Sequence, residues 1–173
     1  MNLRLNIANA WPWLLLTASI VVLDQFTKLL AEHYLAFYTP VNLLDVSGTG
    51  LNMTLVYNTG AAFSFLSDAG GWQRWVFAVF AVLVSAVLLI WLLRLPAAAR
   101  WLSAALALVL GGAIGNLIDR VLYGHVIDFV DFYSGDWHFP AFNLADSAIT
   151  IGAIMLIIDA LWLQSDAADR TNG

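Results

Sequence analysis

The chain has 173 residues, of which 61% are hydrophobic and 11% are charged, and its mean hydropathy is +0.80. Soluble domains are roughly 45–50% apolar and about 25% charged, so this composition excludes an ordinary soluble globule. The absence of cysteine excludes disulfides, thiolate metal sites and cysteine nucleophiles. The formal net charge is −5, and the few Lys and Arg residues form no basic cluster, so nucleic acid is not an expected partner.

Four apolar stretches are long enough to cross a hydrocarbon core of about 30 Å. The first contains polar residues inside a run of spanning length, and no cleavage pattern follows it, so we interpret it as an uncleaved span. We find no internal repeat or linker, so we expect one integral membrane domain over residues 1–173. The expected spans are residues 11–31, 75–93, 101–118 and 141–163.

The positions of arginine predict the orientation in the membrane. Residues 94–100, between the second and third spans, begin and end with arginine, and Arg4 and Arg170 lie near the two ends of the chain. Positively charged flanks stay in the cytoplasm, so we expect this connection and both termini there. The charged residues of the outward segments, about 32–74 and 121–140, are mostly acidic.

The two outward segments differ in pattern. Residues 51–57 largely alternate apolar and polar side chains before the turn-like residues 58–60, which predicts a small β-sheet on the outer membrane surface. The second segment is short and rich in aromatic residues, which suit the boundary between water and lipid. The sequence therefore predicts an α-helical integral membrane protein with four transmembrane helices and a small extracytoplasmic sheet.

Polar residues intrude into three of the four spans. A charged residue in a span costs roughly 2.5–3.5 kcal/mol on insertion scales, so each one needs a partner, a cavity or a function. Helical spacing puts each set on one face, and the expected topology puts all three sets in the outer leaflet. The sets are Asp24 and Lys28 on the first span, Asn116, Asp119 and Arg120 on the third, and Asn143, Asp146, Ser147 and Thr150 on the fourth.

Gly111 and Gly115 of the third span form a face of small residues that admits another helix backbone. Packing alone explains such a face, and it is equally compatible with a site between helices.

Serine and zinc chemistry have little support. A hydrolytic serine needs a base, but the only lysine, Lys28, is paired in sequence with Asp24, and no Gly-x-Ser-x-Gly turn occurs. The three histidines, His33, His125 and His138, lack the spacing of metal ligands. We therefore expect no metal site.

Two of the candidate carboxylates have a cation beside them in sequence, which favours fixed ionised groups, and two do not. Asp128 and Asp146 are the pair without a nearby cation, so they can share a proton. Peptide hydrolysis by two carboxyl groups needs such a pair, because one accepts a proton from water while the other donates to the carbonyl. The pairs with cations are Asp24 with Lys28 and Asp119 with Arg120.

Other interpretations of these carboxylates stay open from the residues alone. Asp128 could be an exposed loop acid, and Asp146 a first-turn acid favoured by the helix dipole. A small proton- or ion-coupled transporter would also use intramembrane carboxylates. However, the polar residues lie near one face rather than the midplane, and no inverted repeat is visible. A membrane scaffold would leave the polar residues of three spans unexplained.

Five motifs occur in register with the four expected spans, and through them the chain resembles lipoprotein signal peptidase, also called signal peptidase II. This family comprises bacterial aspartyl peptidases of the inner membrane. The motifs are Asp24-Gln25-x-x-Lys28, Tyr57-Asn58-Thr59-Gly60-Ala61-Ala62-Phe63-Ser64, Gly115-Asn116-x-x-Asp119-Arg120, Gly124-His125-Val126-Ile127-Asp128-Phe129 and Phe142-Asn143-x-Ala145-Asp146-Ser147.

The resemblance implies a role for each of these residues. Asp128 and Asp146 would be the catalytic pair, and Asn116, Arg120 and Asn143 would bind the substrate. Residues with structural or orienting roles would be Asp24, Lys28, Asn58, Gly60 and Asp119.

The resemblance also implies the substrate and the setting, and that the reaction needs no metal or organic cofactor. The substrate would be a prolipoprotein cut on the amino side of a cysteine that carries a diacylglyceryl group, with membrane lipid as the other partner. Residues 39–72 would form a sheet that cradles the substrate, with a short interfacial helix that can cover the site. We expect a monomer in the bacterial inner membrane with its active site near the periplasmic face. Asp146 would lie on the order of 7–8 Å below the outer span edge at 1.5 Å per residue.

Overall fold

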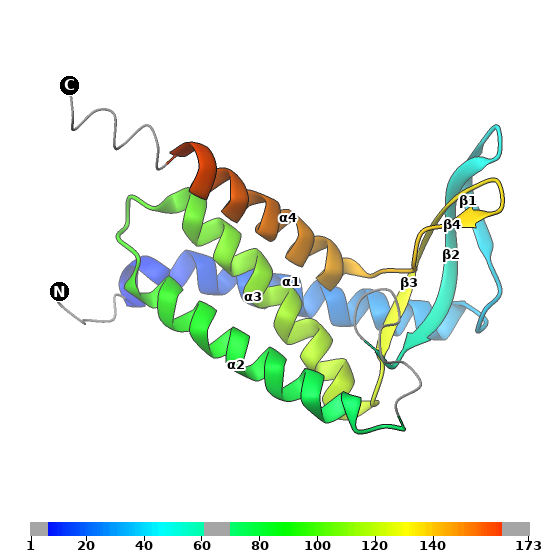
Figure 1. Ribbon diagram of the computed structural model, residues 1–173, viewed down its shortest axis with the longest axis horizontal. Coiled ribbons are helices and arrows are strands. Elements are labelled where there is room, and N and C mark those ends of the chain that lie inside the picture. Colours follow the sequence, from blue (N-terminus) through cyan, green and yellow to red (C-terminus); the bar gives the residue numbers. More distant parts are fainter. Residues whose placement is uncertain (1–6, 61–69, 164–173) are drawn as a thin grey trace.

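The computed structural model describes residues 7–60 and 70–163. Its helices form a bundle, and a small sheet extends from one end of that bundle (Figure 1). All four long helices of this part of the chain are long and apolar enough to cross a membrane, which confirms the predicted spans. They are α1 (Ile7–Tyr34), α2 (Gln73–Arg94), α3 (Arg100–Leu122) and α4 (Leu144–Ile158), and α4 continues into the π-helical turn η2 (Asp159–Leu163).

The ends of the helices differ from the expected span limits by a few residues. α1 and α3 run further toward the sheet than apolarity alone predicts, and end at Tyr34 and Leu122. In α3 the added turn contains Asp119, which is buried inside the bundle. α4 begins three residues later than expected, because Asn143 stands in extended conformation as its N-cap.

The sheet has four antiparallel strands in the order β1-β2-β3-β4. The predicted strand at residues 51–57 is confirmed within β2, which pairs with β1 and β3. The short interfacial helix expected nearby has no counterpart in residues 39–60 or 70–72, and residues 61–69 lie outside the described part. The strands are β1 (Val41–Val46), β2 (Thr49–Asn58), β3 (Val126–Ser134) and β4 (Trp137–His138).

Sequence reasoning placed the second outward segment at the membrane interface and missed that it forms a long strand. β3 pairs with β2 along most of its length. The sequence feature that could have predicted this strand is a nine-residue run rich in β-branched and aromatic residues. This run lies between Gly124 and Gly135, which both have positive φ, as a chain reversal requires. β3 carries Asp128 from the sheet toward the bundle.

α3 is the central helix, and it packs against α1, α2 and α4. The predicted face of small residues is confirmed on its α1 side. A Cβ added at Gly111 would lie 2.9 Å from Ile20 Cβ, and one added at Gly115 would lie 2.5 Å from Asp24 Oδ2. These glycines therefore let α1 approach α3 closely enough for polar side chains to meet between them.

The two ends of the bundle differ. The start of α1, the connection between α2 and α3, and the end of α4 lie at one end, and the sheet lies at the other (Figure 1). Many large apolar side chains of the helices are exposed, as expected for helices that face lipid. Of the polar residues singled out in the sequence, five are instead buried between α1, α3 and α4, toward the sheet: Asp24, Lys28, Asn116, Asp119 and Asn143.

Substitution of Gly115 tests this close approach. Helix propensity alone predicts that Gly115→Ala stabilises α3 by up to about 1 kcal/mol. We expect the opposite, a loss of about 1–3 kcal/mol, because the added methyl group would collide with the Asp24 carboxylate. Thermal unfolding of the purified protein in detergent measures the difference, and a raised Tm would contradict the packing argument.

Candidate active site

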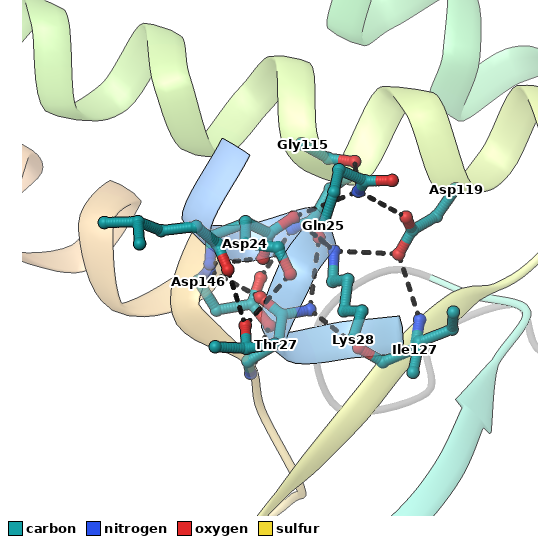
Figure 2. A network of polar contacts seen from close by, with 12 residues as sticks. Asp24, Gln25, Thr27, Lys28, Gly115, Asp119, Ile127 and Asp146 are labelled. Atoms are coloured by element: carbon teal, nitrogen blue, oxygen red, sulfur yellow. Dashed lines mark hydrogen bonds and ion pairs between the residues drawn. The ribbon is translucent and has the colours of Figure 1, made fainter. Parts of the chain in front are cut away.

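Lys28 lies buried between two aspartates from different helices (Figure 2). Its Nζ is 2.8 Å from Asp24 Oδ2 on its own helix and 2.8 Å from Asp119 Oδ2 on α3, and none of the three side chains is more than 2% exposed. The predicted pair of Asp24 and Lys28 is confirmed. The sequence paired Asp119 with Arg120, which is wrong, because the ion-pair partner of Asp119 is Lys28 across the helix interface.

The two aspartates also hold backbone N–H groups of other elements. Asp119 Oδ2 accepts from Ile127 N at 3.1 Å in β3, and Asp24 Oδ1 accepts from Ala145 N at 2.9 Å in α4. Gln25 donates to both carboxylates, a link that sequence reasoning missed although Gln25 lies within the first motif. Each of the two backbone amides belongs to the residue just before a candidate catalytic aspartate. The ion pairs therefore fix where those aspartates stand.

Asp128 is a buried residue of β3, so the interpretation as an exposed loop acid is wrong. Its Oδ1 accepts from Asn143 Nδ2 at 2.8 Å and its Oδ2 accepts from Asn58 Nδ2 at 3.2 Å. Burial, and secondly the negative charge of Asp146, raise the pKa of Asp128 to about 7. Near neutral pH this carboxyl can therefore either hold or release a proton.

Asp146 stands in the first turn of α4 and takes part in a capping box with Asn143. Its backbone N–H donates to Asn143 Oδ1 at 2.9 Å, and its Oδ2 accepts from Asn143 N at 3.3 Å. The first-turn role expected from the helix dipole is therefore present. However, Oδ1 serves no cap, because it accepts from Asn116 Nδ2 at 2.7 Å across the interface with α3.

Asn143 connects the two candidate carboxyl groups. The residue is completely buried, and its Nδ2 lies 2.8 Å from Asp128 Oδ1 and 3.1 Å from Asn116 Oδ1. Its Oδ1 meanwhile accepts from the backbone of Asp146. The structure thus brings Asp128, Asp146, Asn116 and Asn143 into one hydrogen-bonded cluster, although they come from a strand, two helices and a helix cap.

Arg120 is on the same end of α3 and links the cluster to the end of β2. Its guanidinium donates to Gly60 O at 3.2 Å and to Asn116 O at 3.3 Å. Gly60 N in turn donates to Asn58 Oδ1 at 3.0 Å. The predicted polar set on α4 extends less far than expected, because Thr150 is exposed and Ser147 donates to a carbonyl of its own helix.

A second buried carboxylate on β3 lies outside this cluster. Asp131 Oδ1 lies 2.9 Å from His138 Nδ1, and Asp131 Oδ2 accepts hydrogen bonds from Asn52 and Thr54. Successive side chains of a strand point to opposite faces, so Asp131, three residues from Asp128, faces away from it. Within residues 7–60 and 70–163, no group of three His, Asp or Glu side chains is placed to hold a metal ion.

Comparisons with known proteins place this chain in a family. The family model described as "Signal peptidase (SPase) II" matches residues 16–162. A lipoprotein signal peptidase of Pseudomonas syringae pv. tomato is 57% identical over 151 residues, which cover 87% of this chain and 84% of that protein. One of Acinetobacter baylyi is 51% identical over 158 residues, which cover 91% and 86%.

The fold of this chain is also similar to those of solved structures. A bacterial membrane enzyme determined by the in meso method at 2.3 Å resolution has a TM-score of 0.77 and 31% identity, with 90% of each chain covered. A second, at 1.9 Å resolution, has a TM-score of 0.72 over 87% of this chain and 93% of that one. Because the family model spans most of the chain and relatives above 50% identity cover most of their own length, the chain belongs to the signal peptidase II family.

Proposed function

We propose that this chain removes the signal peptide from lipidated prolipoproteins, with Asp128 and Asp146 as its catalytic pair. The observation that carries the proposal is that the buried carboxyl group of Asp128 and the partly buried one of Asp146 are joined through one residue. Asn143 donates to Asp128 Oδ1 from its side chain and to Asp146 Oδ2 from its backbone N–H. Neither has a Lys or Arg side chain within ion-pair distance among the described residues. Such a pair can hold one proton between two carboxyl groups, as aspartic peptidase chemistry requires.

The reaction then proceeds by general acid and base catalysis. One ionised carboxylate takes a proton from a water molecule, and the water oxygen bonds to the scissile carbonyl carbon. The other carboxyl group donates its proton to the carbonyl oxygen, which gives a tetrahedral diol. When this diol collapses, the C–N bond breaks and the first carboxyl group passes its proton to the departing amine of the lipidated cysteine. The second carboxylate takes back a hydroxyl proton of the diol. Because the pKa of Asp128 is about 7, we assign the shared proton to Asp128 at neutral pH.

The three residues expected to bind substrate have different surroundings. The polar side-chain atoms of Asn116 and Asn143 are engaged with Lys28, Asp128 and Asp146, so we assign these two residues to orienting the pair. The Arg120 guanidinium has five N–H groups, of which two donate to backbone carbonyls. We therefore keep Arg120 as the residue that contacts the substrate backbone or the ester groups of its lipid.

The orientation of the bundle supports a site at the periplasmic face. The arginines at residues 94 and 100 lie at the end opposite the sheet, together with the start of α1 and the end of α4 (Figure 1). The positive-inside rule places that end in the cytoplasm. The cluster then lies in the outer leaflet, where the diacylglyceryl chains of a substrate anchor. All residues of the site come from one chain, so we propose one domain that acts as a monomer.

The transporter alternative is not favoured. A coupled transporter needs ionisable groups that are reachable from both sides, with its binding site near the midplane. Here the cluster lies at the sheet end of the bundle, and the family members matched are peptidases.

Removing either catalytic carboxyl tests the proposal. We expect Asp128→Asn and Asp146→Asn each to lower cleavage of a diacylglyceryl-modified precursor on the order of 1,000-fold or more, because neither amide can exchange the proton. The matched control is Asp131→Asn on the same strand, which should keep most of the activity. Release of the signal peptide by purified protein measures the effect. An unlipidated precursor should be cleaved poorly, and full activity of either catalytic variant would refute the pair.

The pH dependence should follow Asp128. The acid form is needed, so kcat/KM should fall tenfold per pH unit above about 7, where Asp128 loses its proton. The hydrogen bond from Asn58 favours the ionised form, so Asn58→Ala should raise the pKa of Asp128. The alkaline limb of the pH profile, where kcat/KM falls, should then move to higher pH. Asn42→Ala, which removes a donor to Asn52 and Tyr133, is the control and should leave the limb in place. A limb that moves downward in Asn58→Ala would contradict the assignment.

The absence of cysteine makes the orientation easy to test. Asp136 in the turn before β4 and Ala98 between α2 and α3 are both exposed. In intact cells, a membrane-impermeant maleimide that reaches the periplasm should label Asp136→Cys and spare Ala98→Cys. After the cells are broken, both variants should react. The reverse pattern in intact cells would overturn the proposed orientation.

A further inference from the structure

Lys28 can only donate hydrogen bonds, so each group around its ammonium must be an acceptor. An ammonium group has three N–H donors and no acceptor. The three acceptors around Lys28 Nζ are Asp24 Oδ2 at 2.8 Å, Asp119 Oδ2 at 2.8 Å and Asn116 Oδ1 at 3.0 Å. The side chain is 2% exposed, so water does not replace any of them. Each N–H of Lys28 thus has one protein acceptor.

This contact fixes which way the Asn116 amide faces. Its oxygen must point to Lys28, because an NH2 group there would meet another donor. The Asn116 Nδ2 must then face Asp146, where it lies 2.7 Å from Oδ1. The same Asn116 oxygen lies 3.1 Å from Asn143 Nδ2, so it accepts from both Lys28 and Asn143.

The Asn143 amide is fixed in the same sense by one donor and two acceptors. The backbone N–H of Asp146 must find an acceptor, and it lies 2.9 Å from Asn143 Oδ1. The amide nitrogen of Asn143 therefore faces Asn116 Oδ1 and, at 2.8 Å, Asp128 Oδ1. Neither amide can rotate by 180° without setting donors against donors.

We infer that Lys28 is a positioning residue for the reaction: through Asn116 and Asn143 it obliges Oδ1 of Asp146 and Oδ1 of Asp128 to accept hydrogen bonds, which leaves the shared proton to the Oδ2 oxygens. The inference rests on the proposed catalytic pair. It adds which oxygen atoms exchange protons with water and substrate, and which buried cation selects them.

The lengths of the contacts agree with this assignment. The two Oδ1 atoms accept at 2.7 and 2.8 Å, whereas Asp128 Oδ2 and Asp146 Oδ2 accept at 3.2 and 3.3 Å. Shorter bonds are typical of a fully negative acceptor, and an oxygen that carries the proton is the weaker acceptor. A lysine also suits this position for a second reason. It forms ion pairs with the carboxylates of both Asp24 and Asp119, which hold the backbone just before each catalytic residue.

The first test removes the obligate donor. We expect Lys28→Met to lower kcat on the order of 100-fold, because the positions of the protons on the catalytic pair change. KM for a lipidated precursor should change only a few-fold, because the surface that binds the substrate stays the same. The matched control is Thr17→Val. Thr17 on the same helix donates to Ala107 O of α3 at 3.1 Å and is buried, so its loss should lower Tm and leave kcat unchanged.

The second test keeps the shape of Asn116 and changes only its donor. In Asn116→Asp, Lys28 retains an acceptor, but an oxygen without a hydrogen faces Asp146. Protonation of the introduced carboxyl restores the donor, so the variant should have low kcat at pH 7 and an optimum shifted to lower pH. Asn116→Leu cannot regain a donor and should be slow at every pH. The charged groups that contact Asn116 are Lys28, Asp146 and Arg120.

The outcomes separate this inference from the proposed function. If the wild-type protein cleaves the precursor and Asp128→Asn does not, the assignment of the catalytic pair is supported independently of the role of Lys28. Unchanged kcat in Lys28→Met, or an unshifted pH optimum in Asn116→Asp, would then overturn the positioning role alone. If Lys28→Met fails to accumulate in membranes, the comparison of Asn116→Asp with Asn116→Leu decides the question.

Discussion

The ion pairs of one buried lysine determine the placement of the remaining polar groups. Burying charges is unfavourable unless each charge is paired and the remaining lone pairs are satisfied. Lys28 meets Asp24 and Asp119, and the other donors to these carboxylates include backbone N–H groups of Ile127 and Ala145. Removing Lys28 would leave two carboxylates without a cation at low dielectric. The same contacts that make the charges tolerable in the membrane therefore tie β3 and α4 to α1 and α3.

This arrangement requires the helices to be close, and glycine supplies the space. Gly115 lies directly against the Asp24 carboxylate, and Gly111 lies one turn away against Ile20. A larger residue at either position would separate α1 from α3. The Lys28 stem would then no longer reach both partners. Small residues in α3 are therefore as necessary for the ion pairs as the charged residues themselves.

Sequence reasoning recovered the features that depend on composition or on spacing within one helix. Apolar length predicted the four helices, and i, i+4 spacing predicted that Asp24 and Lys28 share a face. It failed where contacts join separate elements: the partner of Asp119 lies on another helix, so neighbours in sequence pointed to Arg120. The strand β3 was missed because an aromatic run suits an interface equally well until its partner β2 is known. Burial of Asp128 depends on that same pairing.

The residue between the two carboxyl groups shows how stability and chemistry share one side chain. Ser, Thr, Asp and Asn all serve well as helix N-caps, so capping of α4 alone does not explain Asn143. Only asparagine among these has both an amide oxygen for the Asp146 N–H and an amide nitrogen for the Asp128 carboxyl. An aspartate there would cap equally well but set a third negative charge beside the pair. The cap position is therefore constrained by the carboxyl pair more tightly than by the helix that it begins.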